Sequence, residues 1–158
     1  KGSIGLKVAK LSKAFGMKVR FLSAQKLKKS NLNKFLKEID ILTIHCPLNK
    51  NTENLISLKE LKLMRKDSII INTARGGIVN EKDLVHALNK KIISAAGIDV
   101  TTVEPPKKTH PYYKIINSPN FIWTPHTAWA SDETLKNALD QLIENINAYY
   151  LGKPKNLV

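Results

Sequence analysis

The chain has 158 residues, of which 42% are hydrophobic and 25% charged, a composition that fits one globular domain and excludes disorder and collagen-like repeats. It has no apolar run of about 18 residues to span a bilayer, no secretory signal and a single cysteine, Cys46, so we expect a cytoplasmic protein with no membrane contact, disulfide framework or cysteine-based zinc site. The formal net charge of +13 could indicate nucleic-acid binding, but only three of the 26 basic residues are arginine, and a general lysine bias is the simpler explanation.

The amino-terminal part of the chain alternates between helix and strand patterns. Apolar residues at helical spacing predict a helix over residues 4–15, which Gly16 ends. A short strand is predicted at 19–22, followed by a short helix over 32–38. Residues 39–44 are apolar and rich in β-branched side chains, which predicts a buried strand.

The same alternation continues through the middle of the chain. Ser57 and Glu60 form a capping box, which predicts the start of a helix. Residues 68–73 include three consecutive isoleucines and predict a strand covered on both faces, as in a parallel sheet. Asn80 is predicted to cap the next helix, and a strand over 92–99 follows it.

The last third of the chain begins with a loop. Residues 101–118 show no periodicity, and loops of this length inside a compact domain are usually functional. A short strand is predicted at 121–123. Ser131 then begins one long terminal helix that ends before Gly152.

Strands that alternate with helices predict an α/β fold with a doubly wound parallel sheet, of the Rossmann-like kind. The chain opens on Gly2 at a helix start, with no strand ahead of it. In a dinucleotide-binding fold, the glycine turn joins the first strand, at the centre of the sheet, to the first helix. We therefore expect residues 1–158 to be a partial dinucleotide-binding domain that lacks its first strand.

The amino terminus also offers a phosphate-binding pattern. Gly2 and Gly5 lead into a helix as in the second half of a glycine-rich dinucleotide turn, although two glycines near a terminus are also compatible with no function. Ser23 stands where an acidic ribose ligand normally follows the next strand. Lysines at 26, 28 and 29 leave two interpretations open there, a site that accepts a 2′-phosphate and a solvated lysine face.

Ionisable side chains follow three of the predicted strands, at the edge where open α/β sheets bind ligands. Arg75 comes just after the strand at 68–73 and could bind a carboxylate with both guanidinium nitrogens. Asp99 and Glu104 follow the next strand, where a helix-capping or solvated carboxylate is the alternative. His126 follows the last strand and could exchange a proton near neutral pH, although a lone histidine is usually structural.

The other histidines are interpreted as less important. His45 closes a strand ahead of Pro47 and is expected to line the cofactor or to be structural. His86 in a helix and His110 in the long loop are expected to be surface residues.

Six stretches of the chain carry a family resemblance: GSIG at 2–5, FGMKV at 15–19, TIHCPLNKNTENLI at 43–56, INTARGGIVNEKDLVHAL at 71–88, GIDVTTVEPP at 97–106 and TPHTAWAS at 124–131. In this order they resemble the cofactor-binding domain of the D-isomer-specific 2-hydroxyacid dehydrogenases. The tryptophan in the last stretch is more similar to the glycerate dehydrogenase and hydroxypyruvate reductase members of that family. The resemblance runs nearly from end to end of the chain.

The resemblance implies an oxidoreductase that transfers a hydride between NAD or NADP and a small 2-oxoacid such as hydroxypyruvate or glyoxylate. It implies that His126 donates and accepts the proton, that Glu104 is its carboxylate partner, and that Arg75 binds the substrate carboxylate and carbonyl. No metal is implied. The cofactor site that it implies consists of Gly2, Ser3, Ile4, Gly5, Ser23, His45, Pro47, Thr52, Thr73, Ala74, Asp99 and Ala128.

The chain departs from the family pattern at its amino-terminal side. The first glycine of the fingerprint, its strand and the substrate-domain segment are missing, and Ser23 replaces the usual acid. We therefore expect little turnover from these residues alone and a homodimer for the full-length protein. A nicotinamide-nucleotide sensor or co-repressor that binds cofactor without turnover is the alternative function, but a sensor has no need of the acid–base pair Glu104 and His126.

Overall fold

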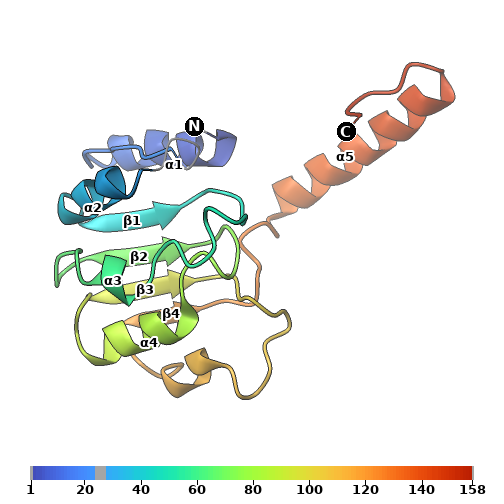
Figure 1. Ribbon diagram of the computed structural model, residues 1–158. Coiled ribbons are helices and arrows are strands. Elements are labelled where there is room, and N and C mark those ends of the chain that lie inside the picture. Colours follow the sequence, from blue (N-terminus) through green and yellow to red (C-terminus); the bar gives the residue numbers. More distant parts are fainter. Residues whose placement is uncertain (1, 24–27, 158) are drawn as a thin grey trace. The chain divides into compact units, whose positions relative to one another are not determined.

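The computed structural model describes residues 2–23 and 28–157, which divide into two compact units, Lys1–Pro125 and His126–Val158. The first unit contains a four-stranded parallel sheet in the order β1 (Ile41–Ile44), β2 (Ile69–Asn72), β3 (Ala95–Ile98) and β4 (Phe121–Trp123) (Figure 1). Strands that neighbour one another in sequence order, as here, make up one half of a doubly wound sheet. The predicted Rossmann-like α/β fold is confirmed.

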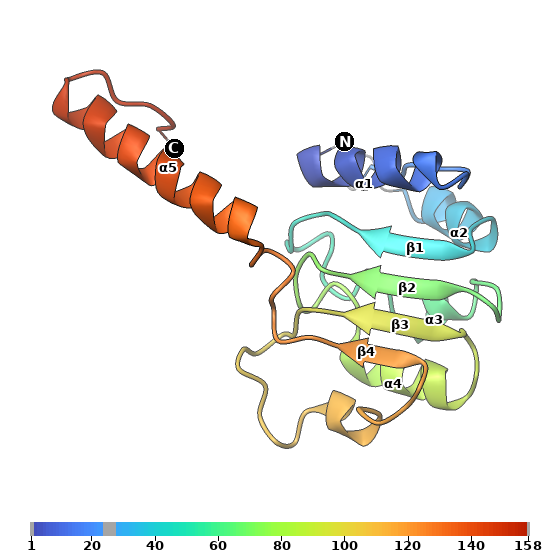
Figure 2. The same ribbon diagram turned by 180° about the vertical axis from the view of Figure 1, so that it is seen from behind.

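One face of the sheet forms the core of the first unit. The strand register places Leu42, Ile70, Ala96 and Phe121 side by side, and all four side chains are buried. The helices α3 (Leu58–Leu61) and α4 (Glu81–Asn89) lie over a single face, in front of the strands in Figure 1 and behind them in Figure 2. Leucines of both helices join this core, which sets the sheet rigidly under the loops at its edge.

The helices α1 (Ser3–Ala14) and α2 (Lys29–Lys37) lie beyond the β1 end of the sheet. Leu32 and Leu36 of α2 are buried in the core, because they recur four residues apart on one side of the helix. In α1, Ala9 is the buried residue, while Ile4 and Leu11 are exposed, as is Phe15 just after the helix. The predicted helix over 4–15 is confirmed with its start and end each shifted by one residue.

Helix caps in the structure follow the sequence signals. Ser57 and Glu60 make the predicted capping box of α3, although that helix ends at Leu61. The side chain of Asn80 accepts the Asp83 N–H at 3.1 Å and begins α4 as predicted. In the second unit, Ser131 caps α5 (Asp132–Tyr150), which ends before Gly152 as expected. No helix of the described residues is long and apolar enough to cross a membrane.

Three expectations about the strands and one about the long loop are corrected. Residues 19–22 form no strand, because a strand is held by a neighbouring ladder and the described chain supplies none there. The face of β2 that carries Ile69 and Ile71 is only half-buried, since α3 and α4 pack on the opposite face. The strand predicted over 92–99 is confined to β3, and the loop predicted over 101–118 contains a short 3₁₀ helix, η2 (Pro111–Lys114).

Candidate active site

The carboxyl end of β2 presents Arg75 on a tightly held turn. The side chain of Asn72, the last residue of β2, is buried and makes two hydrogen bonds across this turn. Its Oδ1 accepts the Ala74 N–H at 3.1 Å, and its Nδ2 donates to the Arg75 carbonyl oxygen at 3.0 Å. Arg75 itself is exposed, and its guanidinium donates to the Ala74 carbonyl oxygen at 2.6 Å. Thr73 is exposed and Ala74 half-buried on the same turn.

The Arg75 turn lies directly against the loop that follows β3. A Cβ atom added to Gly76 would lie 2.0 Å from the carbonyl carbon of Thr101 and 2.4 Å from the amide nitrogen of Thr102. Only glycine fits so close a backbone approach. The structure thus brings the turn that carries Arg75 together with the loop that carries Glu104.

The exits of β3 and β4 are joined at the same edge. Asp99 is buried, its N–H donates to the Asn72 carbonyl oxygen at 3.0 Å, and one of its carboxylate oxygens accepts the hydroxyl of Thr124. Glu104 is exposed, and its Oε1 accepts the Thr101 N–H at 2.8 Å. Polar groups from three strand exits therefore share the edge where ligands of open α/β sheets bind.

His126 and Ala128 belong to the second unit. His126 has a φ of +54°, in the left-handed region, and its carbonyl oxygen accepts the Trp129 indole N–H at 2.8 Å. Ala128 is exposed. The meeting of His126 with Arg75 and Glu104 stays a prediction.

The start of α1 fits the phosphates of a dinucleotide. Gly2 has extended backbone angles, and the first turn, which includes Ser3, Ile4 and Gly5, contains no acidic residue. First-turn N–H groups of a helix have no partner within the helix and attract anions. A Cβ at Gly2 would meet nothing within 4 Å, so a ligand has room to approach the backbone there.

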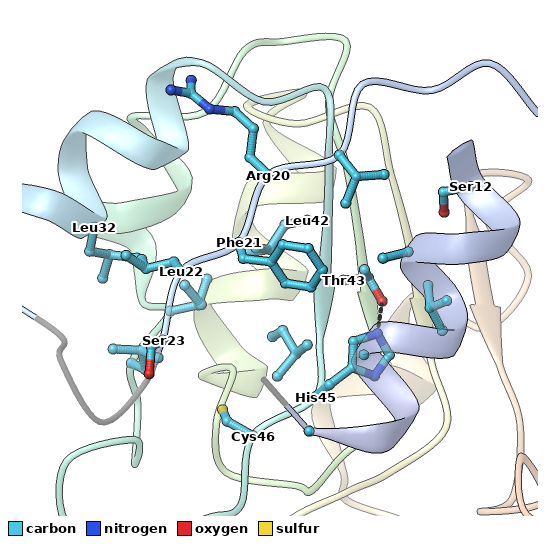
Figure 3. Close-up of a pocket in the computed structure, with 18 of the residues that line it drawn as sticks. Ser12, Arg20, Phe21, Leu22, Ser23, Leu32, Leu42, Thr43, His45 and Cys46 are labelled. Atoms are coloured by element: carbon cyan, nitrogen blue, oxygen red, sulfur yellow. Dashed lines mark hydrogen bonds between the residues drawn. The ribbon is translucent and has the colours of Figure 1, made fainter. Parts of the chain in front are cut away.

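A cavity of about 490 Å³ lies between α1, residues 19–23 and β1 (Figure 3). Its lining is mostly apolar and includes Ser23, which is exposed, as well as His45 and Cys46. The ring of His45 shares a hydrogen bond of 2.9 Å with the Thr43 hydroxyl, and a Cβ added to Gly5 would lie 3.6 Å from the His45 side chain. Burial lowers the pKa of His45 and raises that of the Cys46 thiol, which favours uncharged forms of both groups.

Pro47 and Thr52 lie on the loop after β1. The Thr52 hydroxyl donates to the Pro47 carbonyl oxygen at 2.7 Å and accepts the Asn49 N–H at 2.8 Å. Thr52 is only 1% exposed, so its hydroxyl shapes the loop from the inside, while Pro47 is exposed. Contact of either residue with a cofactor stays a prediction.

The sequence did not predict the contact between the side chains of His110 and Glu81. His110 was expected at the surface, but its side chain is 7% exposed and its Nε2 lies 2.9 Å from Oε2 of Glu81. The His110 ring also stacks on Trp123, with centroids 5.6 Å apart. Position in a long loop misled the interpretation, whereas Pro111 after His110, at the start of a 3₁₀ turn, was a signal of local order. Nothing in the sequence signalled Glu81 as its partner.

The functional groups at the carboxyl edge of the sheet are polar side chains and backbone N–H groups. Among residues 2–23 and 28–157, no group of three His, Cys, Asp or Glu side chains is placed to hold a metal ion. What the first unit does present is the exposed guanidinium of Arg75 beside a loop with an exposed carboxylate, and, at the start of α1, a helix terminus suited to phosphates.

The chain is similar in sequence to known proteins. Residues 1–128 match the family described as D-isomer specific 2-hydroxyacid dehydrogenase, NAD binding domain. The chain is 42% identical to the glycerate dehydrogenase of Methylorubrum extorquens and 36% identical to the hydroxypyruvate reductase of Blautia hydrogenotrophica, in each case over 99% of this chain and 50% of the relative. The chain thus spans about half the length of the curated relatives it matches.

The chain is also similar in fold to solved structures. An acyclic imino acid reductase, Bsp5, determined in complex with NADPH and D-Arg, superposes with a TM-score of 0.84 at 36% identity. The superposition covers 99% of this chain and 51% of that one.

Proposed function

Because the chain belongs to the D-isomer specific 2-hydroxyacid dehydrogenase family, we propose that the protein transfers a hydride between NAD or NADP and a small 2-oxoacid such as hydroxypyruvate or glyoxylate. The observation that carries this proposal is the contact of Gly76 with Thr101 and Thr102, which sets the Arg75 turn beside the Glu104 loop at the carboxyl edge of the sheet. The names of the similar glycerate dehydrogenase and hydroxypyruvate reductase support the substrate class.

Arg75 is proposed to bind the substrate. Its guanidinium is exposed on a turn that the buried amide of Asn72 fixes, so it can meet a ligand in a defined direction. A guanidinium binds a carboxylate with two parallel hydrogen bonds, and a donor near the 2-oxo group stabilises negative charge that develops on its oxygen. Arg75 therefore serves both to hold the substrate and to polarise its carbonyl group.

His126 and Glu104 are proposed to move the proton. In the direction of reduction, an imidazolium at His126 gives a proton to the substrate oxygen, and in oxidation the neutral ring takes it back. A carboxylate beside the ring orients it and favours its charged form, which is the role assigned to Glu104. The bound nicotinamide supplies or accepts the hydride.

The cofactor is proposed to extend from the start of α1 to the carboxyl ends of the strands in the first unit. Gly2, Ser3, Ile4 and Gly5 offer backbone N–H groups to its phosphates, because α1 begins there without an acidic side chain. Ser23 is proposed to face the ribose, and Thr73, Ala74 and Asp99 at the strand exits are proposed to approach the nicotinamide end. His45, Pro47, Thr52 and Ala128 complete the proposed site.

The 158 residues alone are proposed to have little turnover. The relatives are about twice as long, and the substrate half of their cleft is proposed to come from the part that this chain does not cover. The full-length protein is proposed to be a homodimer. An assay of the isolated chain with hydroxypyruvate and either cofactor checks the first point, and ordinary dehydrogenase turnover would refute it.

The test of function uses the full-length protein. We expect oxidation of NADH or NADPH with hydroxypyruvate or glyoxylate, and a loss of 10²- to 10⁴-fold in kcat in His126→Ala, about the contribution of a general acid. His86→Ala, on the exposed side of α4, is the matched control and should keep the parent rate. If His126→Ala retained near-parental activity, the assignment of the acid would be wrong.

A further inference from the structure

The carboxylate of Glu81 holds the loop that follows β3 at two places. Its Oε1 accepts both the N–H and the hydroxyl of Thr102, at 2.7 and 2.9 Å. Its Oε2 lies 2.9 Å from Nε2 of His110, which begins η2 further along the same loop. The Glu81 and His110 side chains are 16% and 7% exposed, so water competes little for the hydrogen bond between them, whereas Thr102 is exposed.

The helix that carries Glu81 does not need this side chain as its cap. Asn80 already caps α4 by accepting the Asp83 N–H. Glu81 is the first residue of α4, and its carboxylate binds the loop. A rigid helix packed on the sheet thus anchors a loop that has no regular structure between β3 and η2.

The ring of His110 is held by hydrogen bonds at both of its nitrogen atoms and by contacts with two aromatic rings. Its Nδ1 accepts the Tyr112 N–H at 3.3 Å, so in the neutral ring the proton lies on Nε2, which donates to Glu81. Trp123, the last residue of β4, stacks on the ring, and Tyr112 contacts its edge with centroids 4.8 Å apart. The hydrogen bond therefore requires no positive charge on His110.

Two contacts of the Thr101–Thr102 backbone lead to the proposed site. Gly76 lies so close to Thr101 and Thr102 that the loop and the Arg75 turn cannot move toward each other. The Thr101 N–H donates to Oε1 of Glu104. The backbone that Glu81 holds is therefore the one on which Arg75 and Glu104 depend for their positions.

We propose that Glu81 and His110 are a positioning pair for Arg75 and Glu104, acting through Thr102. This inference rests on the function proposed above. Misplacement of reacting groups by about 1 Å can cost on the order of 10²-fold in rate. Loss of the pair should therefore reduce turnover although neither side chain is proposed to touch substrate or cofactor.

The test compares two neutralised carboxylates in the first turn of α4, within the full-length protein. Glu81→Gln keeps the size of the side chain, but its amide can accept from only one side, and its N–H₂ then faces the N–H of His110 or of Thr102. Asp83→Asn is the matched control, because its amide oxygen can still accept the Leu58 N–H that Asp83 binds at 2.8 Å. Both changes remove one negative charge from the same helix end.

For Glu81→Gln we expect kcat with the 2-oxoacid to fall about ten- to a hundredfold, with the KM for the cofactor unchanged. We also expect faster hydrogen exchange at the Thr102 amide. Asp83→Asn should match the parent in both measurements. A merely structural role for Glu81 would lower kcat only in proportion to the fraction of folded protein, measured by circular dichroism on the same sample, so that kcat per folded molecule would stay at the parental value.

The outcomes separate this inference from the proposed function. A parent protein without reductase activity contradicts the proposed function and, with it, the positioning role, whereas the exchange rate at Thr102 still reports whether Glu81 holds the loop. An active parent whose Glu81→Gln variant keeps kcat within twofold overturns the positioning pair alone. Should Glu81→Gln fail to fold, Thr102→Val, which loses the hydroxyl bond to Glu81, is expected to lower kcat about fivefold, against Thr102→Ser as its control.

Discussion

Asn72 donates from Nδ2 to the carbonyl oxygen of Arg75 at 3.0 Å, so the side chain that ends β2 also closes the turn that presents the guanidinium. Its Oδ1 accepts the Ala74 N–H as well. One buried amide thus links the core of the sheet to the residue proposed to bind substrate.

Replacement of this amide should damage both stability and activity. Asn72→Ala leaves the Ala74 N–H and the Arg75 carbonyl without their partners, which costs roughly 1–3 kcal/mol in the free energy of unfolding. We also expect a higher KM for the 2-oxoacid. Urea denaturation and steady-state kinetics check the two effects, with Asn89→Ala, at the exposed end of α4, as a control within about 0.5 kcal/mol. Equal stability of the two variants would contradict the role of Asn72.

The close approach at Gly76 should not tolerate a side chain. In Gly76→Ala, the new Cβ would overlap the Thr101 backbone, which must then move, at a cost of roughly 1–3 kcal/mol or more. We expect a lower Tm together with a loss of turnover. Gly97→Ala is the matched control, because its Cβ would meet only Ile71, at 4.0 Å. A Gly76→Ala variant with parental Tm would show that the two loops are not in contact.

The choice between NAD and NADP should respond to residue 23. In Ser23→Asp, a carboxylate would accept the ribose hydroxyls of NADH and repel the 2′-phosphate of NADPH. The ratio of kcat/KM for NADPH to that for NADH should fall at least about tenfold, equivalent to about 1.4 kcal/mol. Ser30→Asp, exposed on α2, adds the same charge away from the cavity and should leave the ratio unchanged. An unchanged ratio in Ser23→Asp would place the ribose elsewhere.

His45 should make stability depend on pH. Burial lowers the pKa of His45 in the folded protein below its ordinary value of 6.5. Between about pH 7 and pH 5, the unfolded chain therefore binds more protons than the folded one, and the free energy of unfolding falls as the pH falls. His45→Gln should be less pH-sensitive over this range in urea denaturation than the parent protein. Parallel curves for His45→Gln and the parent would exclude this contribution.

Most of the fold could be predicted because its signals are local. Helix caps such as Ser57, Asn80 and Ser131 act within one turn, and the run of isoleucines in β2 marked a strand, although only one of its faces is fully buried. The segment at 19–22 has the composition of a strand but forms none, because a strand also depends on a neighbour that composition does not reveal. The lengths of the strands were overestimated for the same reason.

The site could be predicted only in part. Arg75 and Glu104 were selected as candidates because each follows a strand, and parallel strands end at one edge; their roles stay a prediction. The packing of their two loops through Gly76 was not predicted, since a contact between backbones depends on the fold and not on the side chains in the sequence. The pairing of Glu81 with His110 spans 29 residues and joins a helix to an irregular loop, so no periodic pattern could indicate it.

The edge position of β1 has a consequence for work with the isolated 158 residues. Among the described residues, β1 is the first strand in the sheet order, Ile41 is 42% exposed, and a mostly apolar cavity lies beside it. An edge with unpaired backbone groups and apolar neighbours can recruit a strand from another molecule. Concentrated solutions of this chain should therefore form aggregates through intermolecular β-pairing, and light scattering that rises with concentration would reveal it.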